Sequence, residues 1–568
     1  MNDASTASFD HSVDVLVVGS GAGAMTAALR AHDGGARVLL IEKTDRYGGA
    51  SAMSSCVLWI PNNHLMAEAG VPDSPEEAYQ YLAGTTAGLV PEERLRAFLD
   101  AGPRALRYLV DQTRVRLMPL PEYPDYYPRI PGSKPGARSL EPCHFDARLL
   151  GDEFLRMRDQ NPQMQVMGRF LMTVAEARAV LTGQPGSMLL FAKLMLGYAL
   201  DIPFRFRSKR DRRLAMGNAL VGMLRLSLHD RDIPLWLETP AQQLIVEDGR
   251  VVGVVAQREG RPIRIRAERG VILAAGGFEG SQAMREKYLP HPTRAEWSCA
   301  NRHNTGDPIN MGLAVGAGLD LMDDAWWGPV TVAPGEPFAR MFVIEKSLPG
   351  GILVNDRGER FVNEGAPYID IVNAMYAQHQ NGTPCVPAHL VFDSTFRKKY
   401  ICGPLLQGSV QPDWMRRKLF RIGYVKRADT LDGLARQLGV DAAQLAESVR
   451  KFNDYARTGT DLEFGRGDTI FDRYYGDAEV GPNPCLAPIE KPPFYAIEAH
   501  PGELGTKGGL RTDARARVLT EAGAPIPGLY AIGNCSASVM GRSYPGAGAT
   551  IGPAVTFGFV AASDAVQN

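Results

Sequence analysis

Residues 13–43 read VDVLVVGSGAGAMTAALRAHDGGARVLLIEK, and this stretch decides the fold. The apolar, β-branched run 13–18 predicts a buried parallel strand, which is followed by an alanine-rich helix and a second strand near 38–41. Gly19, Gly21 and Ala24 give the turn a G-x-G-x-x-A spacing. The first glycine of such a turn allows the bend, the second lets the backbone approach a pyrophosphate, and a small third residue permits close helix packing. Glu42 closes the second strand, where a carboxylate can accept hydrogen bonds from a ribose.

The pattern therefore predicts a dinucleotide site, with the phosphates at the N-terminus of the first helix. The spacing alone does not distinguish FAD from NAD. Gly48, Gly49 and Ser51 continue into a second small-residue loop, which resembles the flavin-contacting loop of the fumarate reductase and 3-ketosteroid dehydrogenase flavoproteins. FAD is therefore the expected cofactor. The residues predicted to hold it in this part of the chain are Gly19, Gly21, Ala22, Gly23, Ala24, Glu42, Lys43, Gly48, Gly49, Ser51 and Ala52.

Strand-and-turn patterns recur far along the chain. RVVGVV (250–255) predicts a strand, and GVILAAGG (270–277) and LYAIGNC (529–535) each predict a strand that enters a glycine turn. These turns add Ala275, Gly276, Gly533 and Asn534 to the predicted FAD residues, and the start of the helix predicted from 549 adds Ala549 and Ile551. The expected fold class is α/β. A discontinuous Rossmann-like FAD domain (1–280 and 490–568) receives an inserted α+β catalytic domain (281–489), in which ILVN and RFVN (352–363) suggest a hairpin.

Composition narrows the remaining choices. At 568 residues the chain is long enough for two or three domains, and a formal net charge of −1 disfavours nucleic acid as a partner. The seven cysteines are scattered without a CxxC pair, which predicts no metal site and fits a reducing compartment. The first residues lack the basic start and apolar run of a signal peptide, so a cytoplasmic location is expected.

Residues 188–213 leave two alternatives open. MLLFAKLMLGYAL (188–200) is apolar except for Lys193, and the run RFRSKRDRR (205–213) is strongly basic. One interpretation is a core helix followed by a solvated charge run. The other is peripheral membrane association, in which the apolar helix lies in the interface and the basic run meets anionic headgroups.

The segment GRSYPGAGATIGPA (541–554) places a lone phenol among small residues. It resembles the closing segment of 3-ketosteroid Δ1-dehydrogenases, and PDYYPRIPG (124–132) and ERFVNEGAPY (359–368) resemble two further active-site segments of that family. The resemblance spans 13 to about 562. It implies an FAD-dependent oxidoreductase that acts on a 3-ketosteroid and passes electrons to a quinone-type or artificial acceptor. It assigns catalysis to Tyr126, Tyr368, Tyr544 and Gly548.

The chemistry of desaturation beside a ketone explains why such groups are needed. Desaturation beside a ketone removes an α-proton and a β-hydride, so the enolate oxygen needs hydrogen-bond donors. The resemblance gives that task to the Tyr544 hydroxyl and the Gly548 N–H, and makes Tyr368 the base for the C2 proton while the C1 hydride goes to flavin N5. The assisting tyrosine is Tyr126 or Tyr127, and the motif favours Tyr126. Tyr123 and Trp326 are candidate walls for a flat steroid.

Three rival functions remain at this point. A 3-ketosteroid Δ4-(5α)-dehydrogenase would share the fold and the flavin site. A fumarate reductase-type flavoprotein would bind a dicarboxylate through arginine and histidine, residue types that occur in HPTRAEW (291–297). A non-catalytic flavoprotein would need no set of active-site tyrosines.

Overall fold

The computed structural model describes residues 8–181 and 185–567. At its centre lies an eight-stranded sheet in which β1 (His11–Val18) runs parallel to β2 (Val38–Ile41) and to β11 (Arg261–Leu273). β21 (Pro525–Ala531) continues the parallel order beside β11, and β8 (Leu235–Trp236) continues it beside β2. Strands from both ends of the chain thus share one sheet, as the sequence predicts.

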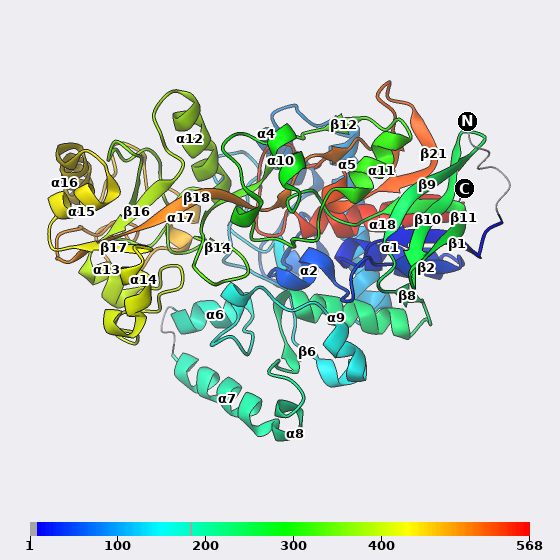
Figure 1. Cartoon of the computed structure of the whole chain (residues 1–568), viewed down its shortest axis with the longest axis horizontal. Coiled ribbons are helices and arrows are strands. Elements are labelled where there is room, and N and C mark those ends of the chain that lie inside the picture. The colour runs from blue at the N-terminus through cyan, green and yellow to red at the C-terminus, as the bar shows by residue number, and fades with distance from the viewer. Residues whose placement is uncertain (1–7, 182–184, 568) are drawn as a thin grey trace.

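Two helices from opposite ends of the chain cover this sheet. α1 (Ala22–Asp33) and α18 (Ile551–Gln567) lie side by side in Figure 1, in blue and red. A Cβ on Gly23 would come within 2.7 Å of the Ala554 carbonyl oxygen, so only glycine permits this approach. Antiparallel strands extend the sheet: β9 (Ala241–Glu247) and β10 (Arg250–Arg258) beyond β11, and β20 (Arg517–Leu519) beside β21. The predicted α/β class with a Rossmann-like nucleotide fold is confirmed.

A second sheet forms the other end of the molecule (Figure 1). Its strand order is β14-β13-β18-β16-β15, with β17 also paired to β18. The strands are β13 (Ala325–Thr331), β14 (Arg340–Met341), β15 (Gly351–Val354), β16 (Ala388–Phe392), β17 (Val425–Ala428) and β18 (Phe494–Thr506). α12 (Tyr368–Gln380) packs against β13 and β18, whereas α15 (Leu431–Leu438) and α16 (Ala442–Thr458) share a separate small core with β15. Smaller helices here are α13 (Ser394–Lys399), α14 (Arg417–Arg421) and α17 (Ile470–Tyr474).

The predicted hairpin at 352–363 does not form. β15 pairs along its length with β16, and only one isolated bridge, between Val354 and Arg360, joins the two predicted halves. Arg360 instead enters a buried ion cluster in which its guanidinium contacts both Glu364 and Asp461 at 2.8 Å. A buried guanidinium needs such partners. The edge of β15 that pairs is taken by β16.

The strand β18 begins at Phe494, close to the predicted start of the C-terminal FAD segment at 490, yet it pairs within the second sheet. The chain returns to the first sheet only at β20 and β21. We infer that the second unit reaches Thr506 and that the nucleotide unit resumes after it.

The helical segment between β2 and β8 surrounds the junction of the two sheets. It contains α2 (Gly49–Met53), α3 (His64–Glu68), α4 (Pro75–Thr86), α5 (Glu92–Gln112), α6 (Val174–Leu181), α7 (Ser187–Leu200), α8 (Ile202–Arg205) and α9 (Met216–His229). Short strands accompany them: β3 (Leu58–Trp59), β4 (Leu117–Pro119), β5 (Ser139–Pro142), β6 (Phe145–Asp146) and β7 (Arg213–Leu214). The linking elements α10 (Gln282–Tyr288), α11 (Asp307–Ala314), β12 (Leu319–Asp320) and β19 (Gly509–Leu510) lie between the sheets in sequence.

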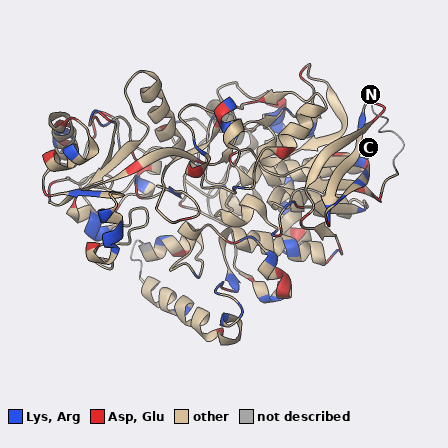
Figure 2. Ribbon diagram, viewed as in Figure 1, with Lys and Arg blue, Asp and Glu red and all other residues tan. Residues whose placement is uncertain are grey.

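The helix α7 is not part of the core. It lies at the lower margin of the molecule in Figure 1, and Figure 2 draws it almost wholly as uncharged residues. Only Ser187 and Leu194 of this helix are buried, while Met188 and Leu189 are 74% and 77% exposed. The core-helix interpretation of 188–200 is therefore wrong. No helix within residues 8–181 and 185–567 has both the length and the apolar character needed to span a bilayer.

Candidate active site

The carboxyl ends of the parallel strands converge on a glycine-rich edge. Gly19 follows β1, Glu42 follows β2, and Ala275 and Gly276 follow β11, while Gly533 follows β21. This edge is where open α/β sheets bind nucleotides. All four ends carry residues that the sequence predicts for FAD.

The glycines at this edge are of two kinds. Gly19 (φ +118°) and Gly276 (φ +80°) are left-handed, and a Cβ on them would come within 2.5 Å of Ala274 O and 2.6 Å of Asn304 Cγ. These two serve the packing of the chain. Gly49 (φ +52°) and Gly533 (φ +64°) are left-handed too, but a Cβ on them would meet no neighbouring atom nearer than 3.9 Å and 3.5 Å. The second kind therefore leaves more room beside the backbone than the first.

Polar groups line the same edge. Glu42 accepts a hydrogen bond from Ser20 Oγ at 2.6 Å and another from the Thr44 N–H at 3.0 Å. The Ser51 hydroxyl oxygen accepts from the Ala22 N–H at 3.0 Å, which joins α2 to the start of α1. The Gly48 N–H donates to Ser20 Oγ at 3.0 Å, so the two predicted loops are held together at two points.

The other predicted FAD residues lie around this edge with varied partners. The Lys43 ammonium donates to Asp307 Oδ2 at 2.7 Å, and Asn534 Oδ1 accepts from Trp326 Nε1 at 3.3 Å. Ala52 and Ala549 are fully buried, and Ile551 is the first residue of α18. This edge of the sheet offers small residues, backbone donors and one carboxylate, and this set fits an FAD molecule.

Three of the predicted catalytic side chains form one buried cluster. The Tyr126 and Tyr368 hydroxyls lie 2.9 Å apart, and the rings of both lie within 5.3 Å of the Tyr544 ring, centroid to centroid. Trp326 packs edge-on against Tyr544 at 5.0 Å. The cluster brings together residues from three distant segments of the chain.

The hydroxyl chain extends beyond this cluster. Tyr126 also lies 3.3 Å from the Tyr123 hydroxyl, which in turn lies 2.5 Å from the Tyr475 hydroxyl. The sequence pointed to Tyr123 only as a wall, and nothing in the sequence singled out Tyr475. The ring of Tyr474 stacks on the ring of Tyr123, with the two centroids 4.5 Å apart. Four phenols thus form a continuous line that begins at Tyr368.

The structure separates the adjacent residues Tyr126 and Tyr127. The Tyr127 hydroxyl donates to Asp370 Oδ1 at 3.2 Å and takes no part in the line of phenols. The Tyr126 backbone N–H donates to the Pro545 carbonyl oxygen, which ties its loop to the Tyr544 segment. Of the two candidates, Tyr126 is the one beside Tyr368.

Gly548 has φ +98°, and a Cβ there would come within 2.4 Å of Val57 O and 2.6 Å of Trp59 N. Its carbonyl oxygen accepts from the Trp59 N–H at 3.1 Å, and its own N–H has no hydrogen-bond partner among the described residues. The need for glycine therefore comes from close contact with β3 and from a left-handed backbone. A side chain would collide with protein before it reached a ligand.

A buried acid holds the loop that carries Tyr126. Asp125 accepts from Trp59 Nε1 at 2.9 Å and from Arg138 Nη1 at 2.7 Å, and the Arg138 guanidinium also pairs with Asp73. A Cβ on Gly546 would fall within 2.4 Å of Trp59 Nε1. Asp125 thus stands between β3 and the glycine run, and the aspartate of PDYY is a structural residue.

Lys507 is a buried cation that sequence reasoning missed. Its ammonium donates to the Ser543 carbonyl oxygen at 2.9 Å and pairs with Asp324 at 3.2 Å. The Ser543 carbonyl belongs to the peptide bond that leads into Tyr544, so Lys507 helps to orient that residue. The one available signal was a lone lysine between glycines in GTKGG. Burial lowers the pKa of Lys507 to about 8.

Burial also controls the protonation of the tyrosines. It raises the pKa of Tyr368 and of Tyr126 well above the ordinary value, and it raises the pKa of Tyr544 as well. All three phenols are therefore protonated at neutral pH, because desolvation disfavours the phenolate. Tyr544 is well suited to donate a hydrogen bond, and Tyr368 can accept a proton only if its own proton moves onward.

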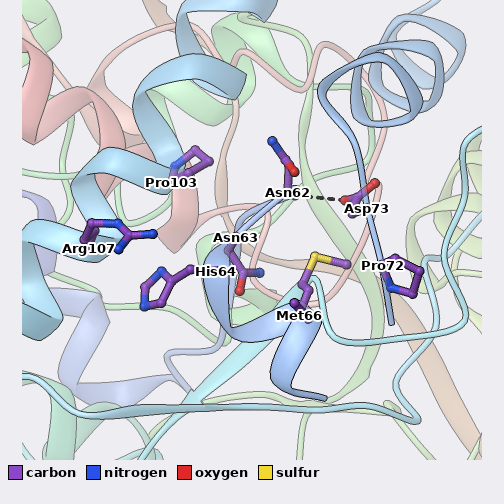
Figure 3. Close-up of a pocket in the computed structure, with 9 residues that line it drawn as sticks. Asn62, Asn63, His64, Met66, Pro72, Asp73, Pro103 and Arg107 are labelled. Carbon is purple, nitrogen blue, oxygen red and sulfur yellow. Dashed lines mark hydrogen bonds between the residues drawn. The ribbon is translucent and has the colours of Figure 1, made fainter. Parts of the chain in front are cut away.

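A cavity of about 310 Å³ lies elsewhere, between α3 and α5 (Figure 3). His64 and Arg107 point into it, and the Asn62 N–H donates to Asp73 beside it. None of the predicted site residues lines this cavity. It is separate from the tyrosine cluster.

The nucleotide edge and the adjoining buried site together define a flavoprotein oxidoreductase. A family model described as an FAD binding domain matches residues 14–551. A 3-oxosteroid 1-dehydrogenase of Mycobacterium tuberculosis is 41% identical, and the alignment covers 97% of each chain. A 4-oxocyclohexanecarboxylate 2-dehydrogenase of Sinomonas cyclohexanicum is 36% identical over 96% of this chain and 92% of its own.

A solved structure extends these similarities. The 3-ketosteroid Δ1-dehydrogenase of Sterolibacterium denitrificans, in complex with 1,4-androstadiene-3,17-dione, has a TM-score of 0.95 and 50% identity, covering 98% of this chain and 100% of its own. The chain belongs to the FAD-dependent 3-oxosteroid 1-dehydrogenase family. It is an oxidoreductase and its cofactor is FAD.

Asp370 allows a test of electrostatics in this region. Burial raises its pKa to about 6, against the hydrogen bond from Tyr127. A carboxyl group with a raised native pKa binds its proton more tightly when folded, so stability falls as pH rises from about 4 to about 6. We expect Asp370→Asn to increase the free energy of unfolding at pH 7 by about 1–2 kcal/mol, because the cost of the buried charge disappears. At pH 4 the gain should be small.

Denaturant unfolding at the two pH values measures this effect, with the exposed Asp429→Asn as the control variant. An equal gain at pH 4 and pH 7 would contradict the interpretation, since it would show that the gain does not come from ionisation.

Proposed function

We propose that this protein introduces the Δ1 double bond into ring A of 3-ketosteroids. The observation that carries the proposal is the buried set of Tyr126, Tyr368 and Tyr544, together with the Gly548 N–H, which has no hydrogen-bond partner within residues 8–181 and 185–567. The names of the relatives that align along nearly the whole chain support the same substrate class.

In this proposal the steroid C3 carbonyl oxygen accepts hydrogen bonds from the Tyr544 hydroxyl and from the Gly548 N–H. A protonated phenol and a backbone amide suit a neutral ketone, and both strengthen their interaction as enolate charge develops on the oxygen. Lys507 holds the peptide that precedes Tyr544, so the donor keeps its position. When bound, FAD supplies the oxidant, an isoalloxazine ring that accepts a hydride.

Tyr368 takes the C2 proton. Its hydroxyl passes its own proton to Tyr126, 2.9 Å away, and the line continues through Tyr123 to Tyr475. This shift lowers the barrier because no isolated phenolate has to form in a buried site. Each phenol in the line can accept one proton as it donates its own. The count balances when the half-buried Tyr475, at the far end, releases one proton to solvent for each C2 proton that Tyr368 takes.

The rival functions make different demands on the site. A fumarate reductase-type site requires cations to hold two carboxylates. The side chains packed on Tyr544 are aromatic, and the nearby cation Lys507 is already paired with Asp324. A Δ4-(5α)-dehydrogenase would place the new double bond elsewhere in ring A. The product of the reaction separates these alternatives.

Anaerobic mixing of the purified yellow protein with androst-4-ene-3,17-dione tests the function. We expect the flavin absorbance to bleach without NAD and the product to carry a 1,2 double bond. A 5α-saturated steroid tests Δ4 activity, and fumarate and 4-oxocyclohexanecarboxylate test the other substrate classes. Bleaching only by the non-steroid ketone would refute the proposal.

We further propose that α7 lies on a membrane surface, with a quinone-type molecule as the electron acceptor. Leu189 and Leu196 are 77% and 58% exposed on a helix that is largely uncovered. Such a face is stabilised by insertion at the headgroup boundary. The seven cysteines are unpaired thiols, which supports a cytoplasmic location. Exchange of Leu189 and Leu196 for serine should lower vesicle binding; unchanged binding would refute the role of α7.

A further inference from the structure

The run 404–424 presents a second apolar surface far from α7 in the sequence. Its exposed apolar side chains are centred on Val410, which is 68% exposed, and Trp414, which is 65% exposed. Leu406, Met415 and Ile422 each expose 48% or more of their surface. An exposed tryptophan among aliphatic side chains is typical of a surface that enters an interface between water and lipid.

Basic side chains surround this apolar group. Lys398, Arg416, Arg417, Lys418 and Arg421 are all exposed, on α13, α14 and the turn before α14. We call these five together with the apolar residues named above the α14 surface. Asp413 is the one acid in the run 404–424, and it already accepts hydrogen bonds from Arg397 and Tyr495. Figure 2 shows the concentration of blue at this end of the molecule.

The cations of the α14 surface differ from those of 205–213 in their ion pairs. Arg417, Lys418 and Arg421 make no ion pair with any described residue. In contrast, five of the six cations in 205–213 are paired: Arg205 and Arg212 with Asp201, Arg207 with Asp152, Arg210 with Asp159, and Arg213 with Glu176. The run that looked like an electrostatic anchor in the sequence is largely neutralised by its own neighbours.

The two surfaces lie along the same margin of the molecule. In the view of Figure 1, α14 and α7 both occupy the lower edge, with α6 between them. In this interpretation a planar surface approaches that edge and meets both helices. An anionic bilayer matches both surfaces, whereas a neutral apolar partner would leave the cations without counter-charges.

We propose that the α14 surface binds anionic lipid headgroups and supplies the electrostatic part of membrane attachment, with Trp414 inserted at the headgroup boundary. The proposal rests on the proposed membrane association, and it assigns to α14 the role that the sequence suggested for 205–213. The lipid partner is a bilayer that carries phosphate-linked negative charge, and a steroid dissolved in that bilayer would lie close to the enzyme.

The test is sedimentation of the full FAD-loaded protein with vesicles of phosphatidylcholine containing about one third phosphatidylglycerol, at low and high salt. We expect the triple variant Arg417→Gln, Lys418→Gln, Arg421→Gln to lower the partition coefficient on the order of 100-fold, since each cation near an anionic surface contributes about fivefold. High salt should reduce binding of the unaltered protein by a similar factor. Vesicles of phosphatidylcholine alone should bind both proteins weakly and equally.

A matched variant controls for net charge. Arg104→Gln, Arg261→Gln and Lys287→Gln together remove the same charge from exposed positions on α5, β11 and α10, distant from α14 in Figure 1. This control should bind like the unaltered protein, and both triple variants should keep their activity on dissolved steroid. Equal losses for the two variants would overturn the proposal, because they would show that net charge alone governs binding.

Other outcomes separate this proposal from the role of α7. If the α14 triple variant binds normally while the serine variant of α7 does not, membrane association stands and the α14 proposal fails. If the unaltered protein binds no vesicle at any salt, both fail. If the α14 surface binds a protein and does not bind lipid vesicles, the proposal is likewise overturned.

Trp414 provides a direct measure of depth. It is the exposed member of six tryptophans, and quenching by brominated phosphatidylcholine in the anionic vesicles reports contact with the acyl boundary. We expect a quenched component that disappears in Trp414→Phe. Equal quenching in the two proteins would contradict insertion of this surface.

Discussion

Exchange of Tyr544 for phenylalanine is expected to lower kcat about 100- to 1000-fold, which is the usual effect of removing one donor from an oxyanion site. The ring packing on Trp326 and Tyr126 remains, because phenylalanine keeps the aromatic body. Only the hydroxyl is lost. The remaining Gly548 N–H would then bear the developing charge alone.

The rate of anaerobic flavin bleaching measures this effect without interference from the electron acceptor. The control is Tyr530→Phe, a buried tyrosine whose hydroxyl donates to Asp564, outside the tyrosine cluster. The FAD content of both variants should equal that of the unaltered protein. Full retention of the bleaching rate in Tyr544→Phe would remove this residue from its assigned role.

Exchange of Tyr368 for phenylalanine removes the base and the first member of the line of phenols. We expect the rate of flavin reduction to fall about 100- to 10,000-fold, the range that a positioned general base contributes. Steroid binding should change little, because Tyr544 and Gly548 still hold the carbonyl oxygen. The loss should therefore appear in kcat and leave the dissociation constant of the steroid nearly constant.

Isotope exchange distinguishes loss of the base from general damage. In heavy water the unaltered protein should exchange the C2 hydrogen of a bound steroid, and Tyr368→Phe should not. Tyr376→Phe is a matched control, since that buried tyrosine lies on the same helix α12 and its hydroxyl donates to the Pro292 carbonyl. Undiminished C2 exchange in Tyr368→Phe would assign the base elsewhere.

The nucleotide-binding half of the molecule could be predicted from local sequence. Strand, turn and helix follow each other within residues 13–43, and each is specified by its own periodicity and glycines. The later strands β11 and β21 carry the same pattern; β11 pairs with β1, and β21 pairs with β11. The end of the second unit was harder to predict from the sequence, because the composition of β18 does not indicate which of the two sheets the strand joins.

The tyrosines show how much of the site could be predicted from the resemblance to the family. Motifs pointed to Tyr368 and Tyr544 and favoured Tyr126 over Tyr127, but spacing alone left that pair open, because consecutive residues in a loop point in different directions. In the structure Tyr126 contacts Tyr368, whereas Tyr127 contacts Asp370. Tyr475 was invisible for the same reason: a hydroxyl contact across 352 residues leaves no local pattern.

The sequence by itself determined the nucleotide fold and the glycine run that carries Tyr544, because short-range backbone geometry dictates both, and the family resemblance of its loops supplied the cofactor. Tertiary structure decided which phenols meet, why Gly548 must be glycine, and which basic residues remain free to face a partner. Those properties depend on what packs against a residue from elsewhere in the chain. The paired arginines of 205–213 and the unpaired cations of α14 look alike as sequence, and only their neighbours separate them.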